Sequence, residues 1–113
     1  MTKAEKEQIV ARLRSYEVLT LRLKNITAEM ETSKESKERL KAEYKEKNRM
    51  KAQIDWALAL LSPRDRMVVQ LMDINRERGN GYKLCQMLDC EIATIYKRRN
   101  FALAQMCQVL LGS

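Results

Sequence analysis

The apolar residues in the first half of the chain recur at the spacing of a helical seam. Successive seam positions alternate in steps of four and three residues, a pattern typical of a coiled coil. They are Ile9, Leu13, Tyr16, Thr20, Leu23, Thr27 and Met30, and Leu19 and Ile26 widen the stripe. This pattern predicts one amphipathic helix over residues 4–31.

Residues 31–51 are mostly charged, and Thr32, Ser33 and Ser36 provide the best place for a break or a new helix cap. A sparser stripe then resumes, at Leu40, Tyr44, Ile54, Leu58 and Leu61, with Lys47 and Lys51 at intervening seam positions. Either one long helix or a hairpin turning near residues 32–36 fits this pattern. Because a long polar helix is unstable alone, we expect the stripe to pack on a second copy or within the chain.

The second half opens with Ser62-Pro63, a strong signal for the start of a helix. Serine caps a helix, proline suits its first position, and Asp65 in the first turn favours the helix dipole. We expect this helix to run to residue 78 and to be followed by a turn at 79–81. A short helix over 82–88, a break at 89–91 and a last helix over 92–111 complete the prediction. Trp56, Ile95 and Leu103 are expected to be packed.

The predicted fold is therefore all-α. Residues 1–61 form a long N-terminal helical arm, as a coiled coil or a hairpin, through which we expect homo-oligomerisation. Residues 62–113 form a helix-turn-helix domain, because a short helix, a short turn and a longer helix follow one another there.

The composition of the chain limits the classes of function that it can have. The formal net charge of +7 suits a polyanionic partner. The longest apolar run, 57–61, cannot span a bilayer, and the first residues lack the apolar core of a signal peptide, so we expect a cytoplasmic protein without a membrane partner. The chain has no histidine and no nucleotide-binding glycine pattern, and we expect neither an enzyme nor a cofactor. Cys85, Cys90 and Cys107 are expected to be reduced and packed, because their spacing does not suit zinc.

The start of the last helix carries the candidate chemistry for double-stranded DNA. The second helix of a helix-turn-helix lies in the major groove with its N-terminal residues near base edges. No acidic residue follows Glu91, and 97–99 is the densest basic run of the half. We expect base contacts from Tyr96, Lys97 and Asn100, and phosphate contacts from Lys83, Thr94, Arg98 and Arg99. The predicted DNA-binding residues are Lys83, Glu91, Ile92, Ala93, Thr94, Tyr96, Lys97, Arg98, Arg99 and Asn100.

Residues 82–106 resemble the C-terminal promoter-reading domain of bacterial sigma factors. Leu84-Cys85, Leu88, Thr94-Ile95, Ala102-Leu103 and Met106 match the family's pattern, and residues 61–71 resemble its preceding helix. The chain departs from the pattern in several places. Asp89 replaces the turn glycine, Glu91 the capping serine and Lys83 a glutamate, while Ile92 and Ala93 stand where polar base readers are common. Arg98 and Arg99 leave one apolar position empty, which Phe101 is expected to fill.

The resemblance covers just under half of the chain, and the rest of a sigma factor is absent. A charged helical arm before such a domain is similar to small phage and prophage transcriptional regulators of the ArpU and RinA type. This resemblance implies a DNA-binding transcriptional regulator, with RNA polymerase as a further candidate partner. Two alternatives stay open: a DNA-packaging adaptor similar to a phage small terminase subunit, and a structural coiled-coil interaction protein.

Overall fold

The computed structural model describes residues 1–32 and 37–112. This part of the chain is all-helical and has no β-strand, in agreement with the predicted fold class. A π-helical turn, η1, directly continues α4. The elements in chain order are α1 (Lys3–Arg14), α2 (Tyr16–Thr32), α3 (Lys37–Ala59), α4 (Pro63–Val69), η1 (Gln70–Ile74), α5 (Asn80–Leu88) and α6 (Ile92–Leu111).

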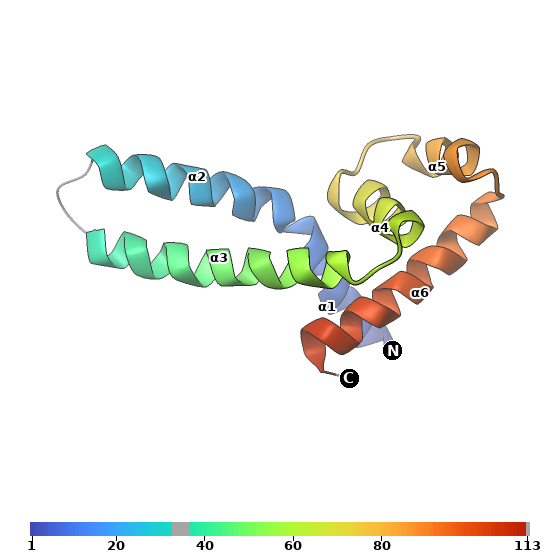
Figure 1. The fold of residues 1–113 in the computed structure, drawn as a ribbon, viewed down its shortest axis with the longest axis horizontal. Coiled ribbons are helices and arrows are strands. Elements are labelled where there is room, and N and C mark those ends of the chain that lie inside the picture. Colours follow the sequence, from blue (N-terminus) through green and yellow to red (C-terminus); the bar gives the residue numbers. More distant parts are fainter. Residues whose placement is uncertain (33–36, 113) are drawn as a thin grey trace.

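Helices α2 and α3 lie side by side as a hairpin that projects from the rest of the molecule (Figure 1). Leu19, Leu23 and Ile26 of α2 are buried, as are Leu40 and Ile54 of α3. The structure therefore takes the hairpin alternative rather than the single long helix. The turn predicted near residues 32–36 lies almost wholly outside the described residues.

The single helix expected over residues 4–31 is wrong, because it is interrupted at Ser15. The Ser15 hydroxyl donates a hydrogen bond to the Arg12 carbonyl at 2.7 Å, while its N–H donates to the Ala11 and Arg12 carbonyls. A serine side chain that bonds the preceding turn competes with the regular helical ladder. The break allows α1 to leave the hairpin direction and pack against α6.

Two hydrophobic clusters hold the helices together. The larger one joins Ile9 and Leu13 of α1 to Leu58 of α3 and to Leu103 and Met106 of α6. This cluster draws on residues from both sides of the predicted boundary at 61 and 62. The smaller cluster takes one fully buried residue from each of α4, α5 and α6, namely Val68, Leu84 and Ile95.

The packing predicted for Ile95 and Leu103 is confirmed, but the packing predicted for Trp56 is wrong. Trp56 is 61% exposed. On the same helix, Ile54, Ala57 and Leu58 are buried and face the core. They fill the inner side of α3, so Trp56 is turned toward solvent.

The start of α4 follows the prediction, but its end does not. Ser62 is the N-cap, and its hydroxyl accepts a hydrogen bond from the Asp65 N–H at 3.2 Å. The helix expected to reach residue 78 ends at Ile74. The helix expected to begin at Tyr82 begins at Asn80, whose buried side-chain amide donates to the carbonyls of Leu71 and Asn75 at 2.8 Å each. This amide closes the turn by satisfying carbonyls that the shortened helix leaves free.

Among the helices of residues 1–32 and 37–112, none combines the length and the hydropathy that a membrane-spanning segment needs.

Candidate nucleic-acid interface

A tight turn connects α5 to α6 and sets the position of the start of α6. The predicted break at 89–91 and the predicted last helix over 92–111 are both confirmed. Asp89 caps α5 in the left-handed region, with φ 50° and ψ 56°, and is the only non-glycine residue with positive φ among those described. It stands where the sigma-factor pattern has a glycine, which adopts this conformation without strain. Glu91 follows in an extended conformation as the N-cap of α6.

Buried contacts fix this turn against the body of the molecule. The smaller cluster lies between α4, α5 and α6, and Cys85, Leu88 and Cys90 pack around it half-buried. None of the three cysteines forms a disulfide within the described residues, and Cys107 is buried in the larger cluster. Among the described residues, no group of three or more His, Cys, Asp or Glu side chains could hold a metal ion.

The structure places the ten predicted DNA-binding residues in two groups. Three of them are half-buried, namely Thr94, Arg98 and Arg99. The remaining seven are exposed, and they are Lys83, Glu91, Ile92, Ala93, Tyr96, Lys97 and Asn100. Ala93, Tyr96, Lys97 and Asn100 recur at three- and four-residue steps along α6 and therefore share one outward face.

Arg99 belongs to the interior rather than to the exposed face. Its guanidinium forms a bidentate pair with Asp73 of η1, with Nε 2.9 Å from Oδ2 and Nη2 2.6 Å from Oδ1. The Asp73 side chain is fully buried and that of Arg99 is only 15% exposed. The hydrogen bond to Asp73 raises the pKa of Arg99. The structure thus gives Arg99 a structural partner in place of a phosphate.

Arg98 has a weaker anchor. Its Nη1 lies 3.3 Å from Oδ1 of Asp65, near the start of α4. The Arg98 side chain is 38% exposed, so this anchor leaves the guanidinium partly accessible to solvent. The sigma-factor pattern has an apolar residue near positions 98 and 99. In this chain both residues are arginines, and each pairs with a buried carboxylate. The expectation that Phe101 fills this apolar position is wrong, because Phe101 is 61% exposed.

Two further residues join the exposed face in space. Arg76, Tyr82, Ile92 and Tyr96 line one hollow where the turn before α5 meets the start of α6. Tyr82 is strongly exposed, and Arg76 lies in the turn that the prediction counted as helix. The exposed aromatic beside Lys83 and the basic pair Arg76 and Arg78 before a glycine were the available sequence signals. Because the prediction extended the preceding helix to residue 78, these signals could not be assigned to a surface shared with α6.

The assembled face offers hydrogen-bond donors and cations, and the exposed carboxylate residue Glu77 also lines its hollow. Helix α6 contains no carboxylate, and Glu91 at its N-cap is exposed. Lys83 lies 3.8 Å from Glu77, with both side chains largely in solvent, so this pair leaves Lys83 available. An ammonium, an amide, a phenol and a nearby guanidinium are the groups that contact phosphates and base edges.

No protein-family model matches the chain, and no curated protein or solved structure shows significant similarity to it.

Proposed function

We propose that this chain is a DNA-binding transcriptional regulator that reads the major groove of double-stranded DNA with the first turns of α6. The observation that carries the proposal is the exposed face of Ala93, Tyr96, Lys97 and Asn100. That face begins directly after a tight turn, lies on a helix without carboxylates, and is held by a buried cluster from three helices. A helix-turn-helix needs these three features.

The residues divide by role in this proposal. Lys97 and Asn100 read base edges, since lysine suits guanine acceptors and asparagine pairs with adenine. Lys83, Arg76 and Arg98 contact phosphates and set the register of the protein on the duplex. Ile92 and Ala93 contact thymine methyl groups. Arg99 holds the helix in place through Asp73.

The wider biological setting rests on the resemblance alone. A charged helical hairpin attached to such a domain is similar to the ArpU and RinA type of phage regulator. We infer a cytoplasmic protein that self-associates and acts near RNA polymerase.

A DNA-packaging adaptor is the second candidate function. The projecting hairpin of α2 and α3 favours it, because small terminase subunits also combine a helix-turn-helix with helical oligomerisation elements. A ring-shaped oligomer in solution would support the adaptor over the regulator. A structural protein without a nucleic-acid partner would bind no duplex at any salt concentration.

Selection of bound genomic fragments, followed by sequencing, tests the proposal. We expect enrichment of one motif, and affinity for it that falls linearly with the logarithm of salt concentration. Lys83→Ala should weaken binding to all duplexes about equally and reduce the salt slope by about one unit. Its effect on folding should be small, because its ion pair is exposed. Binding to no duplex at low salt would refute the proposal.

A further inference from the structure

Helix α2 carries a second stripe on the face opposite α3. Val18 is 65% exposed and Leu21 is 60% exposed. Steps of three and four residues continue this stripe through the exposed residues Asn25, Ala28 and Thr32. We name these five residues the outer seam. The stripe recognised in the sequence, by contrast, has its main apolar residues buried within the chain, namely Ile9, Leu13, Leu19, Leu23 and Ile26.

We propose that the outer seam is a homodimerisation surface on which α2 packs against α2 of a second copy as a short parallel coiled coil. This proposal names the face for the self-association inferred above and does not depend on DNA binding. Val18 then occupies an a position and Leu21 a d position, a combination that favours two parallel strands.

Asn25 determines whether the two α2 helices pair in a parallel or an antiparallel orientation. It occupies the next a position, and in a parallel pair each Asn25 faces Asn25 of the second copy, where the two amides can bond each other. In an antiparallel pair a positions face d positions, so Asn25 would face Leu21 and lose its hydrogen-bonding partner. A single asparagine at an a position fixes register and oligomeric state in this way.

The charges flanking the outer seam complement one another across the same dimer. Glu17 and Lys24 occupy g positions, and Arg22 and Glu29 occupy e positions. In a parallel coiled coil a g residue meets the e residue of the next heptad on the other helix. Glu17 then meets Arg22 of the second copy, and Lys24 meets Glu29 of the second copy. Both pairs have opposite charges.

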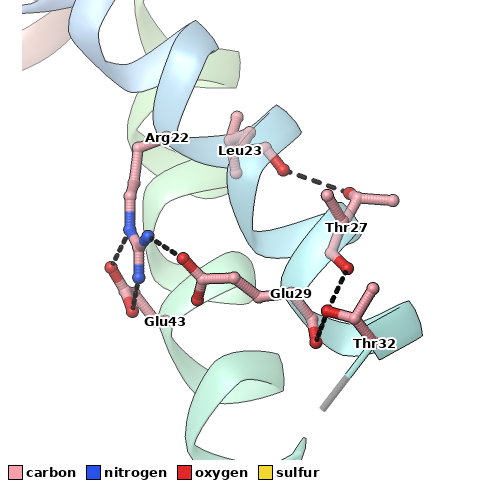
Figure 2. Close-up of polar contacts among 7 residues, drawn as sticks. Arg22, Leu23, Thr27, Glu29, Thr32 and Glu43 are labelled. Atoms are coloured by element: carbon pink, nitrogen blue, oxygen red, sulfur yellow. Dashed lines mark hydrogen bonds and ion pairs between the residues drawn. The ribbon is translucent and has the colours of Figure 1, made fainter.

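The existing ion pairs prepare the e positions for this contact. Figure 2 shows Arg22 bonded to both Glu43 and Glu29, at N–O distances of 2.7 and 2.9 Å to Glu43 and 2.9 Å to Glu29. This group of three carries one surplus negative charge. Lys24, which forms no ion pair within the described part of the chain, supplies a cation from the second copy to Glu29. The arrangement holds Arg22 and Glu29 along the flank before the partner arrives.

Disulfide trapping of full-length Asn25→Cys, without DNA, tests both the surface and the orientation. We expect mild oxidation to give a covalent dimer. The wild-type chain, whose native cysteines are half-buried or buried, and Ala52→Cys, on an exposed position of α3, should give none. A dimer from Val18→Cys mixed with Ala28→Cys, with none from Asn25→Cys, would establish the antiparallel pairing and overturn the proposal.

Sedimentation equilibrium of exposed-leucine variants provides the second measurement. Leu21→Lys should shift the chain to monomer while its circular dichroism spectrum stays unchanged, because Leu21 is 60% exposed and belongs to neither hydrophobic cluster. Leu60→Lys changes a leucine of similar exposure, 57%, directly after α3 and should leave the dimer intact. A wild-type chain that stays monomeric into the millimolar range, or dimers lost with Leu60→Lys but kept with Leu21→Lys, would refute this surface.

Discussion

Arg99 is a basic residue of the candidate reading helix whose charge is used inside the protein. Its partner, Asp73, is fully buried on a π-helical turn, and the pair is bidentate. A buried carboxylate is tolerated only when a cation and hydrogen bonds compensate it. The pair therefore ties the start of α6 to η1, and substitutions that probe DNA contacts should leave Arg99 intact.

Removal of Asp73 should destabilise the fold strongly. Asp73→Ala leaves the Arg99 guanidinium buried without its partner, and we expect a loss of about 3–5 kcal/mol in the free energy of unfolding, measured in urea. Glu46→Ala, which breaks an exposed pair with Arg49, should cost less than about 1 kcal/mol. The double variant Asp73→Leu, Arg99→Met should recover most of the loss. Equal effects of Asp73→Ala and Glu46→Ala would contradict the structural role.

Tyr16 makes stability depend on pH in the alkaline range. Its hydroxyl donates a hydrogen bond to Asp55, to which Lys51 also donates at 3.0 Å. Burial, followed by the bond to Asp55, raises the pKa of Tyr16 above the ordinary value of 10.0. The folded state thus favours the neutral phenol, so its contribution is fully present below pH 10.0 and is lost as the pH rises through the raised pKa.

Comparison of wild type with Tyr16→Phe isolates this effect. Below pH 10.0 the wild type should be more stable in urea, and the difference should shrink or reverse above it. The raised pKa of Lys51 depends first on Asp55, which both proteins retain, and then on Tyr16, so the comparison reports the Tyr16 hydroxyl together with its bond to Lys51. A difference that is constant across this range would show that the Tyr16 hydroxyl does not couple to folding.

At the scale of elements, helix boundaries that depend on local sequence signals were predicted, and boundaries that depend on partners elsewhere in the chain were not. Ser62-Pro63 combines a local cap with a local constraint, and the last helix lies between a short break and a C-terminal glycine, so both were found correctly. The interruption at Ser15 depends on which core each half of the stripe joins. The early end at Ile74 depends on Asp73 and on the amide of Asn80, whose partners lie elsewhere in the chain.

Substitutions at Asp89 should show the strain in the turn between α5 and α6. A left-handed conformation is unfavourable for residues with a Cβ and free of strain for glycine. We expect Asp89→Gly to raise the free energy of unfolding by about 0.5–1 kcal/mol and Asp89→Ala to lower it by a similar amount. Thermal and urea unfolding of the three proteins provide the test. An order other than Gly, Asp, Ala would mean that the Asp89 side chain contributes more than its backbone conformation.

At the scale of the whole molecule, the exposed face of α6 could be predicted from the sequence. Which of its basic side chains stay exposed and which pair with a carboxylate inside the protein could not. Helical spacing alone separates Lys97 and Asn100 from Ile95 and Leu103. By contrast, the partner of Arg99 lies 26 residues earlier in the chain. Trp56 illustrates the same limit, because which face of α3 is covered depends on how the hairpin meets α1 and α6. The outer seam was masked in the sequence by the stronger stripe on the opposite face of α2.

The central claim is that the start of α6 reads DNA, and duplex affinity measured by fluorescence anisotropy tests it most directly. The selected duplex and a scrambled one are titrated with wild type, Lys97→Ala and Asn100→Ala, with Lys45→Ala on the hairpin as control. We expect each α6 variant to lose about 1–3 kcal/mol more on the selected duplex than on the scrambled one. Lys45→Ala should lose no such preference. If both α6 variants are folded and bind the selected duplex as tightly as wild type, α6 is not the reading helix.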